Sequence, residues 1–262
     1  MGSNDLSGLF SMQGKTALVA GGAGAIGSAL AEGLAAYGAS VAVGDWNAAR
    51  AAEVAGRIAQ TTGARSMSVQ LDANDPASVA VAVAAVVSTL GRLDVLVNAV
   101  GTHIEQPAQD VTPEAWDRVV DLNLRGAFML SQGAARAMIA AGRGGSIMHI
   151  TSVRSGLGIR RGYAAYCASK GGLAVLIKQL ATEWAPYQIR VNGIAPTFTR
   201  TPLVADYMND PQFYGDLVKR IPLGRVCETS DLVGIGVFLA SDASAFITGQ
   251  NIFVDGGVTA TQ

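Results

Sequence analysis

Short apolar runs alternate with longer segments of helical periodicity along almost the whole chain. The apolar runs have the length and β-branched content of buried strands, and they occupy residues 16–20, 40–44, 65–71, 94–98, 145–151, 189–195 and 251–255. Between them, apolar positions recur at helical spacing at residues 28–37, 48–62, 76–90, 112–141, 163–185 and 231–240. This alternation predicts an α/β fold: a doubly wound, Rossmann-like parallel sheet of about seven strands with helices on both faces.

The alternation continues without a linker-like tract or an internal repeat, so we expect a single domain. Residues 1–13 form a lead-in, and residues 14–262 form the domain. Residues 197–225 depart from the pattern, because they mix Pro, aromatic and charged residues without a steady period. We interpret this segment as a lid over a substrate site.

A glycine-rich turn joins the first predicted strand to the first predicted helix. It reads Gly21-Gly22-Ala23-Gly24-Ala25-Ile26-Gly27. Small residues let the backbone approach a pyrophosphate, and the helix N-terminus faces that group with free N–H groups. The strand–turn–helix context therefore predicts a dinucleotide site, with a Gly-rich turn in an unrelated doubly wound protein as the alternative.

An acid, Asp45, ends the second predicted strand about 20 residues past the glycines. A carboxylate there can accept hydrogen bonds from both ribose hydroxyls and would repel a 2′-phosphate. The next residue is Trp46, and neither it nor the glycine turn supplies an Arg or Lys. The pattern therefore favours NAD over NADP.

Tyr166 and Lys170 lie four residues apart in a predicted helix, on one face and one turn apart. A cation about 4 Å from the phenol is worth about 4 kcal/mol at an effective dielectric near 20, against about 1.4 kcal/mol per pKa unit. We therefore expect Lys170 to lower the pKa of Tyr166 toward the range of general acid–base catalysis. The alternative is a surface Tyr/Lys pair without a catalytic role.

Further polar residues fall at or near the ends of predicted strands. Ser152 follows the fifth strand and can donate to the same substrate oxygen as Tyr166. In doubly wound sheets ligands bind beyond the carboxyl ends of the strands, where we place Gly21, Asp45, Asn98, Ser152 and Pro196. Asn123, inside a predicted helix, needs partners if buried, and its carbonyl could hold a water or the Lys170 ammonium.

Composition narrows the classes of partner. Of the 262 residues, 15% are charged and the net charge is −1, which gives no reason to expect nucleic acid or an anionic membrane. The longest apolar run, residues 77–87, is too short to span a bilayer. The two cysteines and two histidines show neither a disulfide framework nor metal-ligand spacing, so we expect a cytoplasmic protein without a metal site.

Several motifs occur together in one order and resemble the short-chain dehydrogenase/reductase family over residues 14–257. The glycine turn resembles that family's T-G-x-x-x-G-x-G, residues 98–101 its N-N-A-G, and residues 196–201 its P-G segment near the nicotinamide. The catalytic tetrad, with its Y-x-x-x-K spacing, coincides with Asn123, Ser152, Tyr166 and Lys170. Four positions depart from these motifs: Ala20, Ala25, Ala99 and Thr197. None of the four removes a reacting group.

The resemblance implies reversible hydride transfer between NAD and a secondary alcohol or its ketone. Tyr166 would be the base or acid, Lys170 would lower its pKa with help from the positive nicotinamide, and Asn123 would anchor a water leading protons out past Lys170. The implied cofactor contacts are Gly21, Gly24, Ala25, Ile26, Asp45, Trp46, Asp72, Ala73, Asn98, Ala99, Gly101, Tyr166, Lys170, Pro196, Thr199 and Thr201.

Substrate identity is less constrained. Arg154, Arg160 and Arg161 precede Tyr166, and His103 follows the fourth strand. Some of these could bind a sugar-acid carboxylate or polyol hydroxyls, with a surface or interface role as the alternative. The chain resembles the family's sugar and sugar-acid dehydrogenases, and the substrate residues so implied are Ser152, Arg154 and His103. Aromatic and Met residues in the lid would instead suit an apolar ketone: Phe198, Tyr207, Met208, Phe213 and Tyr214.

Three other functions are considered. A 3-oxoacyl reductase shares the tetrad but usually takes NADPH, which Asp45 disfavours. A non-catalytic NAD-binding scaffold is a second alternative, although every catalytic position is filled. An extended epimerase or dehydratase would need a longer C-terminal domain. The resemblance implies a homotetramer. The Ala-rich helix faces at residues 133–141 and 173–181 give this loose support, although they could equally pack on the sheet.

Overall fold

The computed structural model describes residues 6–261, and for residues 6, 7, 203, 206 and 208 it describes the backbone alone. A seven-stranded sheet runs through the molecule in the order β3-β2-β1-β4-β5-β6-β7, and every neighbouring pair is parallel. The strands are β1 Thr16–Ala20, β2 Ser40–Asp45, β3 Ser66–Gln70, β4 Val95–Asn98, β5 Gly145–Ile150, β6 Ile189–Pro196 and β7 Asn251–Val254. This confirms the predicted fold class, and each strand end lies within one residue of its predicted position.

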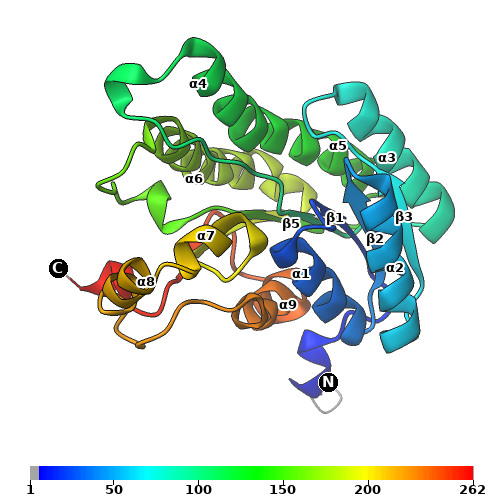
Figure 1. Cartoon of the computed structure of the whole chain (residues 1–262). Helices are drawn as coiled ribbons and strands as arrows, with labels where there is room; N and C mark the ends of the chain where they lie inside the picture. Colours follow the sequence, from blue (N-terminus) through cyan, green and yellow to red (C-terminus); the bar gives the residue numbers. More distant parts are fainter. Residues whose placement is uncertain (1–5, 262) are drawn as a thin grey trace.

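Helices cover both faces of the sheet (Figure 1). One buried apolar cluster joins the sheet to α1 Ala25–Ala36, α2 Ala48–Thr62 and α9 Val233–Ala240. A second cluster on the other face joins it to α3 Pro76–Leu90, α5 Gly126–Ala141 and α6 Ala164–Trp184. The central strand β1 is buried along its whole length, because helices pack on both of its faces.

The single long helix predicted at residues 112–141 is wrong in its middle. The structure has α4 Pro113–Val120, a π-helical segment η3 at Asp121–Arg125, and then α5. In η3 the Gly126 N–H donates to the Asp121 carbonyl, five residues back. Such a π-segment inserts one residue into the helix and often marks a functional site. Periodicity could not show it, because apolar positions continue on both sides.

The segment 197–225, which has no periodic pattern, nevertheless contains two helices, α7 Ala205–Met208 and α8 Pro211–Val218. Both are too short to produce a period in the sequence. The side chain of Asp210 caps α8 by accepting hydrogen bonds from the Gln212 and Phe213 N–H groups, and Pro211 occupies the first turn. In Figure 1, α7 and α8 are drawn to the left of α1 and α9.

The chain order reverses between β1 and β4, which are neighbours in the sheet. Ala20 is paired with Asn98 at the carboxyl ends of these strands. The glycine turn after β1 and the loop after β4 therefore begin side by side and lead to opposite faces of the sheet. The crevice between two such loops is where ligands bind in doubly wound sheets.

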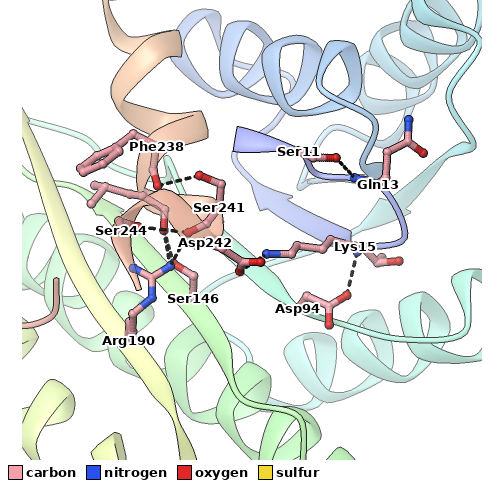
Figure 2. Close-up of polar contacts among 12 residues, drawn as sticks. Ser11, Gln13, Lys15, Asp94, Ser146, Arg190, Phe238, Ser241, Asp242 and Ser244 are labelled. Carbon is pink, nitrogen blue, oxygen red and sulfur yellow. Dashed lines mark hydrogen bonds and ion pairs between the residues drawn. The ribbon is translucent and has the colours of Figure 1, made fainter. Parts of the chain in front are cut away.

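Buried polar groups hold the opposite, amino end of the sheet (Figure 2). Arg190 of β6 donates to the carbonyl oxygens of Leu239 at 2.7 Å and Ser241 at 3.2 Å, near the end of α9. Ser146 of β5 donates to the same Leu239 carbonyl at 2.7 Å. These bonds satisfy carbonyls that the helix end leaves unpaired, and they fix α9 to the sheet away from the carboxyl-end loops.

Candidate active site

A cavity of about 180 Å³ opens at the carboxyl ends of β1, β4, β5 and β6. Segments far apart in the sequence line it: the start of α1, the loop after β4, residues 150–154, the first turns of α6 and the loop after β6. Of the predicted site residues, it brings together Ile26, Ala99, Gly101, His103, Ser152, Arg154, Tyr166, Lys170, Pro196, Thr199 and Thr201.

The glycine turn packs tightly against the loop after β4. Gly21 has φ of +73°, and a Cβ there would lie 2.8 Å from the carbonyl carbon of Ala99. Gly27 leaves no room for a side chain, because its Cβ would collide with the Gly21 carbonyl. These positions require glycine for backbone approach, as a turn that must meet a pyrophosphate does. Gly24 is the N-cap of α1 and Ala25 its first residue; the Gly24 N–H donates to the Gly21 carbonyl at 3.1 Å, and the N–H groups of the first helical turn have no intrahelical partner.

Asp45 holds the glycine turn from the neighbouring strand. It is buried at the end of β2, and its Oδ2 accepts a hydrogen bond from the Ala23 N–H at 3.1 Å. Its Oδ1 accepts from the Asn47 N–H at 3.0 Å. Trp46 beside it is 76% exposed. The carboxylate therefore stands at the turn with no described cation in a salt bridge to it.

Asp72 and Ala73 follow β3, outside the residues that line the cavity. Asp72 is exposed, and its carboxylate accepts from the Asn74 N–H at 2.9 Å. Ala73 is buried, in close contact with Gly126. Asn98 is also buried behind the cavity wall, with its Oδ1 accepting from the Val100 N–H at 3.0 Å.

Tyr166, Ser152 and Lys170 meet in the cavity wall. A side-chain hydrogen bond with Ser152 lowers the pKa of Tyr166, but burial has the larger effect and raises that pKa above its ordinary value. The backbone N–H of Arg154 donates to Ser152 Oγ at 3.1 Å. This bond occupies a lone pair of the Ser152 oxygen and leaves its proton available for donation.

The expectation that Lys170 lowers the pKa of Tyr166 is wrong for the chain by itself. The ammonium lies 5.8 Å from the centroid of the Tyr166 ring and donates instead to the Ile150 carbonyl at 2.7 Å. Burial lowers the pKa of Lys170 to about 8. An effective dielectric near 20 describes a partly solvated pair, whereas burial here disfavours both charged forms, the phenolate and the ammonium.

Asn123 lies in the π-segment and ties it to the loop after β4. Its Oδ1 accepts from the Thr102 N–H at 2.8 Å, and its Nδ2 donates to the Thr102 carbonyl at 2.8 Å and to Ser169 Oγ at 3.0 Å. The Asn123 side-chain carbonyl is thus bound to Thr102 rather than to the Lys170 ammonium. Both groups nevertheless converge on Gly101, whose Cβ would lie 3.3 Å from Asn123 Oδ1 and 3.5 Å from Lys170 Nζ.

Arg154 and His103 both line the cavity. The guanidinium of Arg154 donates to the Gly158 carbonyl at 2.7 Å, and burial lowers its pKa. No described carboxylate forms a salt bridge with it. The ring of His103 packs 5.2 Å from Tyr163 and 6.0 Å from Tyr166, and burial lowers the pKa of His103.

The other two loop arginines lie farther out. Arg161 forms a salt bridge to Glu105 at 2.9 Å and stacks over Tyr207 and Phe213 of α7 and α8. Arg160 is exposed beside an adjoining surface cavity. In the segment 197–225, Phe198 lines the main cavity, and the Tyr207 hydroxyl donates to Glu105 at 2.8 Å. Tyr214 lies beside Arg200, and the Met208 side chain lies outside the described residues.

Sequence reasoning missed several residues that shape this site. Thr102 donates its backbone N–H to Asn123 Oδ1 and accepts from Asn123 Nδ2 through its carbonyl, and Tyr163 is buried against His103 and Tyr166. Glu105 joins three separate segments through Arg161 and Tyr207. Tyr163 could have been found from its position one turn before Tyr166 in the helix pattern. Thr102 and Glu105 carry no such signal, because their partners are distant in sequence.

The arrangement can orient a small polar molecule and exchange a proton with it. Tyr166 and Ser152 offer two hydroxyls to one oxygen, Lys170 supplies a buried positive charge, and Arg154 offers a second cation. The backbone-lined turn beside them suits a dinucleotide. None of the helices in the described part of the chain is long and apolar enough to cross a membrane.

Comparisons with known proteins agree with this geometry. The family model described as enoyl-(acyl carrier protein) reductase matches residues 21–259. The chain is 38% identical to gluconate 5-dehydrogenase of Gluconobacter oxydans over 251 residues, covering 96% of this chain and 97% of that protein. It is also 38% identical to D-threitol dehydrogenase of Mycolicibacterium smegmatis over 251 residues, covering 95% of each.

A crystal structure of a gluconate 5-dehydrogenase from Burkholderia cenocepacia, in complex with NADP and tartrate, superimposes with a TM-score of 0.92. The two chains are 37% identical, and the match covers 97% of this chain and 98% of that one. With likeness of this extent in both sequence and structure, the chain belongs to the short-chain dehydrogenase/reductase family of oxidoreductases.

Proposed function

We propose that this protein transfers a hydride reversibly between NAD and a secondary alcohol or ketone of a small polyol, sugar or sugar acid. The observation that carries the proposal is the meeting of Tyr166, Ser152 and Lys170 in one cavity, beside the glycine turn at the reversal of strand order. The cofactor, when bound, supplies the hydride acceptor or donor. The remaining chemistry is proton transfer and orientation by this chain.

Tyr166 is the proton donor for ketone reduction and the acceptor for alcohol oxidation. Because burial raises its pKa, Tyr166 is protonated at neutral pH in the chain by itself and is ready to act as the acid. Ser152 donates to the same substrate oxygen and stabilises the charge that develops there. Lys170 supplies a buried positive charge one helical turn from Tyr166, and Asn123 fixes the loop that carries Gly101 beside Lys170.

Arg154 supports a polar and often anionic substrate. A half-buried guanidinium without a described carboxylate partner can form paired hydrogen bonds to a substrate carboxylate. The names of the relatives agree with this class, since they include gluconate 5-dehydrogenase, D-threitol dehydrogenase and trans-4-hydroxycyclohexanecarboxylate dehydrogenase. Phe198 and Val204 give part of the cavity an apolar wall, which keeps an apolar ketone as the second candidate.

Asp45 supports NAD as the cofactor. Its buried carboxylate, which holds the glycine turn, would face the adenosine ribose and repel a 2′-phosphate. Solved structures of relatives contain NADP, so a comparison of the two cofactors tests the proposal.

We further propose a cytoplasmic homotetramer. Both cysteines are free thiols, which suits a reducing compartment. Within the helix segments considered from the sequence, Leu173, Ile177 and Leu180 pack in the core and Gly133 lies close to Val79, so these positions are not available to an oligomer interface. The tetramer therefore rests on the family resemblance.

A non-catalytic NAD-binding scaffold is the alternative from another class. Changing Tyr166 to Phe tests it, because the change removes only the phenolic oxygen. We expect Tyr166→Phe to retain NAD binding and to lose about 10²–10⁴-fold in turnover, the usual contribution of a positioned acid–base group. NADH formation measured at 340 nm and NAD binding measured by calorimetry report the two effects separately. Near-normal turnover in Tyr166→Phe would refute the assignment of Tyr166, and wild-type protein that binds NAD but turns over no alcohol or ketone would favour the scaffold.

Cofactor choice is tested at Asp45. We expect wild-type kcat/KM to be higher with NAD than with NADP, and Asp45→Asn to reduce the ratio of the two values by at least about tenfold, because the repelling charge is removed. Glu53→Gln, which removes an exposed carboxylate from α2, is the matched control and should leave the ratio unchanged. A ratio that Asp45→Asn does not alter would contradict the role of the carboxylate.

Substrate charge is tested at Arg154. We expect Arg154→Met to raise KM for gluconate by about 10–100-fold, the range for a lost charge-assisted hydrogen bond, and to change KM for a neutral hexitol by less than about threefold. Arg160→Met in the same loop, an exposed position, is the control. Wild-type activity confined to apolar ketones would eliminate the sugar-acid substrate.

The charge of Lys170 predicts a pH effect on stability. Its pKa falls from 10.5 to about 8 on folding, so between these pH values the folded protein binds fewer protons than the unfolded chain. The free energy of unfolding should therefore rise with pH across this window, by at most about 3 kcal/mol relative to Lys170→Met. Urea denaturation of both proteins from pH 7.5 to 10.5 measures the difference. Parallel pH curves for the two proteins would show that the ammonium is not desolvated.

A further inference from the structure

His149 is a buried histidine that the proposed chemistry does not use. It lies on β5, three residues before Ser152, and its side chain is completely inaccessible to solvent. Both ring nitrogens have hydrogen-bonding partners: Nε2 lies 3.0 Å from Ser131 Oγ of α5, and Nδ1 lies 3.1 Å from Asn98 Nδ2 at the end of β4.

The other hydrogen bonds of Ser131 and Asn98 determine which atom donates and which accepts in each bond to His149. The hydroxyl of Ser131 donates its only proton to the Ala127 carbonyl at 2.8 Å, so Ser131 Oγ must accept from His149 Nε2. At the other end, the Val100 N–H donates to Asn98 Oδ1 at 3.0 Å, so Asn98 must turn its Nδ2–H groups to His149 Nδ1. Both ends independently require the same ring, neutral and with its proton on Nε2.

The chain of bonds ends at the loop that forms the cavity wall. Val100 precedes Gly101, where a Cβ would lie 3.3 Å from Asn123 Oδ1 and 3.5 Å from Lys170 Nζ, so the backbone there leaves little space before these two groups. Ala99 contacts Gly21 of the glycine turn, and its N–H donates to the Ala20 carbonyl at 2.8 Å. A shift of the Asn98 side chain would therefore move the loop against both the glycine turn and Lys170.

We propose that His149 is a positioning residue that holds the loop of residues 98–101, and through it the cofactor-binding wall and Lys170, by locking the side chain of Asn98. A hydrophobic residue could fill the same volume in the core, but it could not accept the Asn98 proton. The inference rests on the proposed function for its kinetic test alone, because the ring's tautomer can be observed without cofactor or substrate.

A protonated ring would break this arrangement. With a proton on Nδ1, His149 would oppose the Asn98 amide N–H, and turning that amide over would oppose the Val100 N–H instead. The surroundings resist protonation: burial, followed by the positive charge of Lys170, lowers the pKa of His149 to about 3. The hydrogen bonds of His149 with Ser131 and Asn98 are therefore kept across the pH range in which the protein would work.

The first experiment observes the ring directly. The chain has two histidines, so ¹⁵N-histidine labelling gives signals from His103 and His149 only, and the His149→Asn variant assigns them. We expect the His149 signals to report a neutral ring with its proton on Nε2, unchanged from pH 5 to pH 9. A ring that carries its proton on Nδ1, or that becomes protonated in this range, would overturn the proposal.

The second experiment separates positioning from core packing. His149→Leu removes both hydrogen bonds, whereas His149→Asn retains an acceptor near the position of Nδ1. Ile147→Val, two residues earlier on the same strand and face, is the control for a general loss of packing. We expect His149→Leu to raise KM for the cofactor about tenfold, as an unsatisfied buried amide would, and His149→Asn to restore KM to within about threefold of wild type.

Two kinetic results would decide against a positioning role. One is that His149→Leu and Ile147→Val lose the same free energy of unfolding and have the same KM for the cofactor. The second is a His149→Asn variant no better than His149→Leu. If wild-type protein shows the expected tautomer but oxidises or reduces no substrate, the proposed function fails while the hydrogen-bonding assignment stands, and cofactor binding measured by calorimetry then replaces KM as the readout.

Discussion

The adjacency of β1 and β4 is the constraint on which the site depends. From β1 the strands follow one another as β2 and β3 toward one edge of the sheet, and from β4 they continue as β5, β6 and β7 toward the other. The glycine turn and the loop after β4 therefore begin at two residues that are paired in the sheet, Ala20 and Asn98. Parallel pairing then places the ends of β5 and β6 on the same edge. A turn that can accept a dinucleotide and a helix that carries Tyr166 are thus brought together by hydrogen-bond register, before any side-chain contact is considered.

Burial, rather than charge pairing, governs the electrostatics of the site. The phenol of Tyr166 is largely, and the ammonium of Lys170 almost completely, shielded from water, so the pKa of the first rises and that of the second falls. Neither shift by itself produces the phenolate that alcohol oxidation requires. A positive nicotinamide beside the pair would favour that phenolate, which explains how one site could serve as acid in one direction and base in the other.

The sequence predicted the sheet and its helices well, because periodicity and turn residues are local signals. It also placed Ser152 at the carboxyl edge of the sheet, because Ser152 follows a strand end, and it placed Tyr166 and Lys170 on one face of the helix that comes next. It could not predict the π-segment at Asn123, because this segment interrupts a helical pattern that continues on both sides. It could not predict the two short helices in residues 197–225 either, because they are too short to show a period. Nor could it predict that Lys170 bonds to Ile150, or that Glu105 ties two loops to α7, because such contacts depend on packing between distant segments.

The most direct test of the account is a titration of the Tyr166 phenol itself. Protein labelled with ¹³C at tyrosine Cζ, with Tyr166→Phe used to assign the signal, gives the pKa of Tyr166 with and without oxidised NAD. The account predicts a pKa above the ordinary value in the protein alone, from burial, and a lower one when NAD is bound. A Tyr166 pKa that is the same in both states would contradict it.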